Sequence, residues 1–195
     1  MLASSSPRRR ELLGSLDLRF TVRAADLDET PLPGEDPRDT VRRLAQAKAV
    51  ARAHPGELVL AADTVVVIDG ELLGKPTDPA DARRVLGRIA GREHTVLTAV
   101  ALEEPDRDRR AAGVATSRVR MATMSPAEID WYVATGEPLD KAGSYAVQGL
   151  GALYIEEVLG NYTNVVGLPL PLTYRLFREL GYDLRDFSVT ASRWR

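Results

Sequence analysis

Cysteine is absent from this chain of 195 residues, and histidine occurs only twice. The lack of cysteine excludes disulfides, thiolate zinc sites, iron–sulfur clusters and a cysteine nucleophile, and it fits a reducing compartment. The two histidines, His54 and His94, lie far apart and show no metal-ligand spacing. We therefore expect both histidines to be structural or surface residues, and we expect neither a zinc site nor a histidine-based catalytic triad.

Long apolar runs and a charge excess are also missing. No window approaches the roughly 18 to 20 consecutive apolar residues that span a bilayer, and no signal-peptide core is visible at the N-terminus. With 26 basic and 28 acidic side chains, the net charge of -2 provides no general attraction for a nucleic-acid backbone. These absences predict a soluble, cytoplasmic protein that binds neither polynucleotides nor membranes.

What is present is the composition of a folded protein. Hydrophobic residues make up 44% of the chain and charged residues 28%, which is enough for a buried core. Strand-like and helix-like segments alternate with short Gly and Pro punctuation, which predicts an α/β fold with residues 1–195 in one domain of two small lobes. We expect strands over 1–4, 58–68, 71–73, 94–102, 115–123 and 153–158, and helices over 7–16, 37–54, 79–90, 126–134 and 169–180.

Serines and arginines crowd the start of the first expected helix, in the segment Ser4–Arg10. Arginines are unfavourable there, because the N-terminus of a helix carries about half a positive elementary charge. A bound phosphate would reverse the sign, since backbone N–H groups, serine hydroxyls and guanidinium groups all bind phosphate. A solvated basic helix end is the alternative interpretation.

Asp63 is the only charged residue between Leu58 and Ile68. Burying an ionised carboxylate costs several kcal/mol unless a cation, a metal or dense hydrogen bonding compensates it. Asp63 could therefore end the strand early and accept backbone amide hydrogens. It could instead be a metal-binding carboxylate that orients or deprotonates water.

Lysine is scarce, and the chain has only Lys48, Lys75 and Lys141 among its basic residues. Lys75 follows a glycine, but the spaced glycine of a P-loop is missing and proline follows the lysine, so a P-loop is rejected. Lys75 is either a phosphate contact or a solvated loop residue, and Lys48 lies on the apolar side of an expected helix. The loop Asp140–Gly149 carries Gln148, whose amide could pair with a pyrimidine edge.

Six motifs in this order resemble those of the Maf family of nucleotide pyrophosphatases, and together they span almost the whole chain. They are Leu2-Ala3-Ser4-Ser5-Ser6-Pro7-Arg8-Arg9, Ala62-Asp63-Thr64, Gly74-Lys75-Pro76, Asp140-Lys141-Ala142-Gly143-Ser144-Tyr145, Gln148-Gly149 and Asn164-Val165-Val166-Gly167-Leu168-Pro169. The resemblance implies a mixed sheet of the Maf/inosine-triphosphatase type, with two lobes flanking a nucleotide-binding cleft. It also implies a homodimer and hydrolysis of nucleoside triphosphates to a monophosphate and pyrophosphate with a divalent metal, Mg²⁺ or Mn²⁺.

The resemblance assigns roles to residues that match the family motifs. Asp63 matches the proton acceptor that activates water, and together with Glu29 it matches residues that hold metal. Substrate choice is assigned to Arg8, Thr64 and Gln148. The positions expected to line the triphosphate are Ser6, Arg8, Arg9, Lys48 and Lys75.

Gln148 matches the branch of the family that prefers dTTP and UTP, so we expect a pyrimidine triphosphate pyrophosphatase with a house-cleaning role. The alternatives are a 7-methyl-GTP pyrophosphatase and a regulator of cell division that binds nucleotides without hydrolysing them. Family members usually have a few residues before the Leu-Ala-Ser stretch, whereas this sequence starts at Met1-Leu2. We therefore expect a short first strand.

Overall fold

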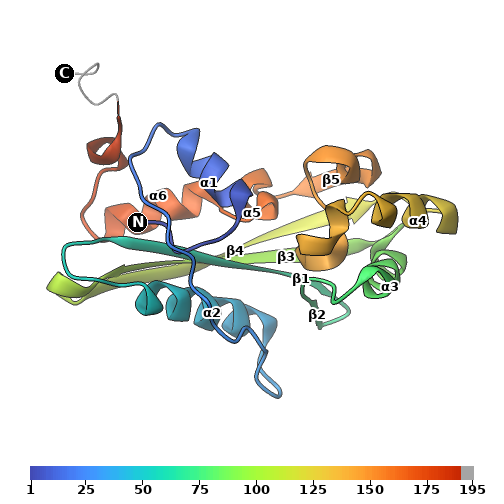
Figure 1. Ribbon diagram of the computed structural model, residues 1–195, viewed down its shortest axis with the longest axis horizontal. Coiled ribbons are helices and arrows are strands. Elements are labelled where there is room, and N and C mark those ends of the chain that lie inside the picture. Colours follow the sequence, from blue (N-terminus) through green and yellow to red (C-terminus); the bar gives the residue numbers. More distant parts are fainter. Residues whose placement is uncertain (190–195) are drawn as a thin grey trace.

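The computed structural model describes residues 1–189 and has a five-stranded sheet at its centre (Figure 1). Every pair of neighbouring strands is antiparallel. The strand order is β2 (Glu71–Leu73), β1 (Val59–Ile68), β3 (Glu93–Glu104), β4 (Arg109–Met121) and β5 (Ile155–Leu159).

Helices cover both faces of this sheet and one of its ends (Figure 1). They are α1 (Pro7–Gly14), α2 (Pro37–Ala51), α3 (Pro79–Ile89), α4 (Pro126–Ala134), α5 (Tyr162–Val166) and α6 (Leu170–Glu179). Short 3₁₀ turns complete the described chain as η1 (Pro105–Arg107), η2 (Glu137–Asp140), η3 (Ala142–Ser144), η4 (Gly149–Tyr154) and η5 (Leu184–Phe187).

Three apolar clusters hold these layers together. Helix α2 packs Val41 and Ala45 on one face of β1 and β3, while α1 and α6 pack Leu13 and Leu176 on the other face. The third cluster lies where α3 and α4 meet the far ends of β1, β3 and β4, around Tyr132. Because β1 is covered on both faces, its sequence is a nearly continuous apolar run instead of an alternating one.

The parallel component of the expected mixed sheet is confined to the N-terminus. The strand expected over residues 1–4 is reduced to isolated parallel bridges from Leu2 to Leu60 and to Val22. Leu60 donates its amide to Met1, and Ala3 donates its amide to Leu60. The first residues therefore pair with β1 only at its start.

Several element boundaries differ from the sequence expectations, and the start of β4 differs most. β4 begins at Arg109 instead of 115 because it continues the hairpin from β3 through Asp108, which adopts a left-handed conformation at φ 45°. Residues 149–154 form η4, so β5 starts at Ile155. The short helix α5 occupies a stretch that was expected to be a loop, and the Asn161 side chain caps its first turn.

No helix within residues 1–189 is both long enough and apolar enough to cross a membrane.

Candidate functional site

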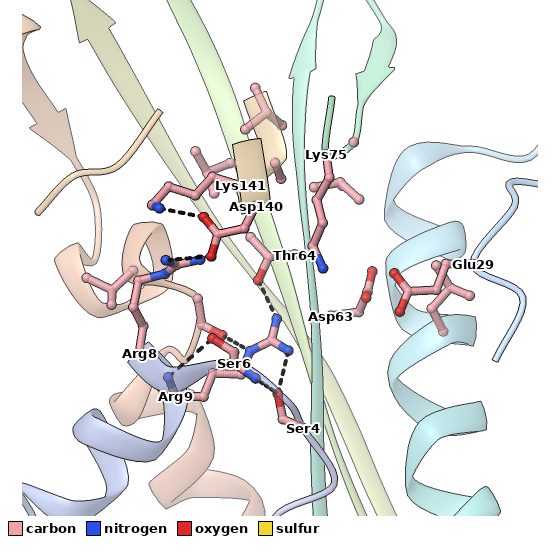
Figure 2. A pocket seen from close by; sticks show the side chains of 18 of the residues that line it. Ser4, Ser6, Arg8, Arg9, Glu29, Asp63, Thr64, Lys75, Asp140 and Lys141 are labelled. Atoms are coloured by element: carbon pink, nitrogen blue, oxygen red, sulfur yellow. Dashed lines mark hydrogen bonds and ion pairs between the residues drawn. The ribbon is translucent and has the colours of Figure 1, made fainter. Parts of the chain in front are cut away.

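A pocket of about 610 Å³ opens beside the central part of β1. One edge of β1 pairs with residues 1–3 near Leu60 and with β2 from Val66 onward. Within the described residues no strand pairs with this edge across residues 61–65, which we call the open edge. Consecutive strand residues point to opposite faces, so Asp63 and Thr64 reach the pocket on opposite sides of the same strand (Figure 2).

Asp63 is buried, and a lysine compensates its charge. The Lys48 ammonium donates to Asp63 Oδ1 over 2.6 Å and lies 2.7 Å from Glu29 Oε1. Lys48 comes from the inward side of α2, Asp63 from β1, and Glu29 from the loop before α2. The strand continues past Asp63 to Ile68. The Asp63 carboxylate pairs with the Lys48 ammonium, which also pairs with the Glu29 carboxylate.

The surroundings of Glu29 favour its ionised form. Partial burial alone would raise the pKa of Glu29, but the hydrogen bond from Lys48 and the positive charges of Lys48, Lys75 and Arg9 outweigh it and lower that pKa. Figure 2 shows the Glu29 and Asp63 carboxylates facing each other, with the exposed Lys75 pointing toward them. Within residues 1–189, Lys75 has no hydrogen bond or ion pair, so its charge is free to meet an anion.

Arg9 joins three parts of the pocket wall. Its guanidinium donates to Thr64 Oγ1 over 3.0 Å, to Ser4 Oγ over 3.1 Å and to the Gly167 carbonyl over 2.7 Å. Burial lowers the pKa of Arg9, although the charges of Asp63 and Glu29 counteract this effect. The half-buried guanidinium therefore fixes the N-terminal loop against β1 and the end of α5, and it places positive charge at the pocket.

Arg8 lies at the rim of the pocket on the side away from Glu29 (Figure 2). Its guanidinium lies 3.6 Å from Asp140 Oδ2, and the Lys141 ammonium donates to Asp140 Oδ1 over 2.6 Å. Lys141 also donates to the Glu137 carbonyl over 2.6 Å. A single exposed carboxylate therefore holds two cations at the mouth of the pocket.

Gln148 is the one assigned residue that does not line the pocket. It is exposed, whereas the preceding Val147 is a lining residue. The Ser6 hydroxyl is the N-cap of α1 and accepts the Arg9 backbone amide. All residues assigned by motif resemblance other than Gln148 line the pocket: Ser6, Arg8, Arg9, Glu29, Lys48, Asp63, Thr64 and Lys75.

Sequence reasoning missed Thr98 and the partnership of Asp140 with Arg8. Thr98 lies opposite Thr64 in the β1–β3 register; their hydroxyls are 3.0 Å apart, and Thr98 donates to the Asn164 carbonyl. The strand pairing could have suggested this contact only if the register had been known. Nothing local in the sequence indicated that Asp140 faces Arg8.

The described residues contain no group of three or more His, Cys, Asp or Glu side chains placed to hold a metal ion. What the pocket provides is a pair of carboxylates, Asp63 and Glu29, with the Lys48 ammonium between them.

Comparison with known proteins gave consistent matches along the chain. A family model described as "Maf-like protein" matches residues 1–180. A protein named "dTTP/UTP pyrophosphatase" from Anaeromyxobacter dehalogenans (strain 2CP-C) is 56% identical over 189 residues, covering 94% of this chain and 95% of that protein. Proteins of the same name from Myxococcus xanthus and Gloeobacter violaceus are each 51% identical. The match to the Myxococcus xanthus protein covers 94% of this chain and 93% of that protein. The match to the Gloeobacter violaceus protein covers 96% of this chain and 97% of that protein.

Proposed function

The chain belongs to the Maf family, and from this premise we propose that it is a nucleoside triphosphate pyrophosphatase that hydrolyses dTTP and UTP. The reaction consumes one water and yields the nucleoside monophosphate and pyrophosphate. Relatives about half identical over nearly their whole length carry the name dTTP/UTP pyrophosphatase. The observation that carries the proposal is a buried strand carboxylate, Asp63, facing a pocket lined with cations.

The charges of the pocket suit a polyphosphate. A nucleoside triphosphate brings about four negative charges, and attack of water on phosphorus requires those charges to be balanced. Lys75 has no competing partner in residues 1–189, and Arg8 is held only by an exposed ion pair with Asp140. Both side chains can therefore turn to phosphate oxygens, while Arg9 stays fixed by its three hydrogen bonds.

Asp63 is the group placed to accept a proton from the attacking water. Lys48 donates to Oδ1, and no hydrogen bond within the described residues uses Oδ2. A carboxylate oxygen without a hydrogen-bond partner can accept a proton from water. Asp63 therefore presents a free oxygen at a buried position of the pocket wall.

We propose that the pocket takes a divalent metal, Mg²⁺ or Mn²⁺. Mg²⁺ prefers oxygen ligands and is commonly held by one or two carboxylates plus substrate phosphates. Asp63 and Glu29 are such a pair, since both face the pocket and the pKa of Glu29 is lowered by Lys48 and its neighbours despite partial burial. When bound, the metal supplies positive charge to the phosphate oxygens.

The proposal is tested by measuring pyrophosphate release from a panel of triphosphates with Mg²⁺ or Mn²⁺. We expect turnover of dTTP and UTP above that of the purine triphosphates and of 7-methyl-GTP. Asp63→Asn should lower kcat by at least about 100-fold because the amide cannot accept the proton. Asp69→Asn is the matched control, since Asp69 lies just beyond β1 and pairs with Arg92 outside the pocket.

The assay also separates the alternatives. A wild-type chain that binds dTTP but releases no pyrophosphate would be a nucleotide-binding regulator, and the proposed hydrolysis would be wrong. Unchanged pyrophosphate release by Asp63→Asn would remove Asp63 from its assigned role while leaving the reaction intact.

We propose that Gln148, Arg8 and Thr64 determine which base is preferred, as the family resemblance implies. Because Gln148 lies outside the pocket lining, it can contact a base only if its side chain turns toward the bound nucleotide. We expect Gln148→Ala to reduce the preference for dTTP and UTP over purine triphosphates. An unaltered substrate profile would show that other residues select the base.

We further propose that the protein acts in the cytoplasm as a homodimer, as the family resemblance implies. Sedimentation equilibrium at micromolar concentration should give twice the chain mass of 21.3 kDa.

A further inference from the structure

A partly buried pair of polar side chains, away from the phosphate side of the pocket, organises the loop that forms the opposite wall of the pocket. The wall consists of Asp140, Lys141, Ala142, Tyr145, Ala146 and Val147. Behind it lie Tyr132 of α4 and Glu137 of η2, neither of which lines the pocket. Neither residue belongs to the six motifs that resemble the Maf family.

Tyr132 and Glu137 form one connected set of hydrogen bonds. The Tyr132 hydroxyl donates to Glu137 Oε1 over 2.7 Å and accepts the Ala146 amide over 3.0 Å. Glu137 accepts two more backbone amides, from Leu150 to Oε2 over 3.0 Å and from Gly151 to Oε1 over 2.9 Å. The cluster thus ties the chain on both sides of Val147 and Gln148 to the end of α4.

Glycines next to the cluster show that the chain is built around it. A Cβ on Gly149 would overlap Glu137 Oε2, and Gly149 also has a left-handed φ of 74°. A Cβ on Gly151 would lie 2.5 Å from the Tyr132 hydroxyl and would overlap the Ala146 carbonyl. Both positions need glycine because the backbone must approach the two side chains closely enough for its amides to reach them.

The carboxylate form of Glu137 matches this set of donors. Burial alone would raise the pKa of Glu137, but hydrogen bonds from Tyr132, Gly151 and Leu150 and the charge of Lys141 lower it. Tyr132 is fully buried, and both hydrogen-bonding capacities of its hydroxyl are used. A glutamine at position 137 would bring an NH₂ group where only acceptors are needed.

We propose that Glu137 and Tyr132 are positioning residues that hold the 145–151 segment in the shape that receives the nucleoside part of the substrate. The inference rests on the proposed function, because it names the part of that same pocket that contacts the nucleoside and not the phosphates. Within the described residues, the side chains of the phosphate-facing Arg8, Arg9, Lys48 and Lys75 make no hydrogen bond or ion pair with Tyr132 or Glu137.

The test compares Glu137→Gln and Tyr132→Phe with matched variants of a second hydrogen-bonded glutamate–tyrosine pair. The Tyr182 hydroxyl donates to Glu104, which also pairs with Arg109, and none of these residues lines the pocket. Glu104→Gln and Tyr182→Phe therefore remove a similar pair without touching the nucleotide. For Glu137→Gln and Tyr132→Phe we expect the KM for dTTP to rise about tenfold with kcat changed less than threefold.

Two further measurements separate positioning from general damage. The inhibition constant of inorganic tripolyphosphate, which lacks a nucleoside, should stay within twofold of wild type in all four variants. Glu137→Asp, which keeps a carboxylate, should recover part of the KM. An equal loss with dTTP and tripolyphosphate, or the same KM change in the Glu104 and Tyr182 variants, would overturn the proposal.

Hydrogen exchange keeps the inference testable if the chain proves not to hydrolyse dTTP. In the nucleotide-free protein, the amides of Ala146, Leu150 and Gly151 should exchange at least tenfold faster in Glu137→Gln than in wild type. The amides of residues 2–9 should be unchanged. Unchanged exchange at residues 146–151 would refute the positioning role, whereas absent pyrophosphate release from the wild type would refute only the proposed function.

Discussion

At the scale of single residues, the pocket depends on a buried lysine between two carboxylates. The side chains of Lys48 and Asp63 are only 9% and 7% exposed, so neither charge is stabilised by water alone. Removing one partner of such a pair leaves the other charge buried without compensation, which costs more than the intact pair contributes. Lys75 is exposed and differs from Lys48 in this respect.

Lys48→Met should therefore lower the free energy of unfolding at pH 7 by about 3 kcal/mol. Lys75→Met should change it by less than about 0.5 kcal/mol, because an exposed lysine without a partner contributes little. Urea denaturation of both variants provides the measurement. Millimolar Mg²⁺ should restore more stability to Lys48→Met than to wild type, since a cation between Asp63 and Glu29 would replace the lost charge. Equal stability of the two variants would contradict the role given to Lys48.

His94 predicts a pH dependence of stability. It is 3% exposed, and its Nε2 shares a hydrogen bond of 2.7 Å with the Tyr145 hydroxyl. Burial lowers the pKa of His94 from 6.5 to about 4. The unfolded chain therefore binds a proton at a higher pH than the folded chain does, and stability falls as the pH drops from about 6.5 to about 4.

The His94 contribution should amount to about 2.5 kcal/mol between pH 7 and pH 4.5. Comparing urea denaturation of wild type and His94→Gln at both pH values isolates it, because the other titrating groups are common to the two proteins. The variant should be less stable at pH 7 but should lose less stability on acidification. Parallel losses in the two proteins would show that His94 does not titrate in this way.

At the scale of elements, a glycine turn lies against the strand that carries Asp63. Gly143 in η3 has a φ of 72°, and a Cβ there would lie 2.7 Å from Val66 Cγ2 of β1. Gly34 has almost the same φ, 73°, but a Cβ at that position would meet nothing within 4 Å. The two glycines therefore separate backbone strain from a packing clash.

Gly143→Ala should destabilise the protein by about 1 to 3 kcal/mol more than Gly34→Ala does. Both variants carry the strain of a left-handed alanine, about 1 kcal/mol, and only the first pushes against β1. Thermal denaturation of the pair gives the difference. Equal destabilisation would mean that the loop moves away from Val66 without cost.

At the scale of the whole molecule, two long strands, β1 and β3, contribute buried residues to all three apolar clusters. β1 contributes Val66 to one cluster, Leu60 to a second and Ala61 to the third. β3 contributes Val96, Val100 and Ala99 in the same way. One cluster cannot be lost without disturbing the strand pairing that supports the other two.

We therefore expect one cooperative unfolding transition, in line with the single domain predicted from the sequence. Calorimetric and van't Hoff enthalpies should agree when the unfolding is followed at a fixed protein concentration. Two separated transitions would show that the lobes unfold independently.

The sequence by itself determined the local features, because each rests on neighbours along the chain. Ser125 with Glu128 three positions later has the spacing of a capping box, and this box begins α4. Asp69-Gly70 is a dipeptide typical of tight turns, and both residues have positive φ between β1 and β2. The apolar run around Asp63 showed that a buried carboxylate needs a partner, and the order of the motifs indicated the family.

Only the tertiary structure decided which groups meet in the pocket. The open edge of β1 exists because the first residues and β2 pair with different ends of that strand. The spacing of apolar residues along the chain does not predict which segments pair in this way. The same holds for Lys48 between Glu29 and Asp63, and for Glu137 beneath the 145–151 segment. These contacts join residues far apart in sequence, so the packing of the whole sheet and its helices had to be known before they could be seen.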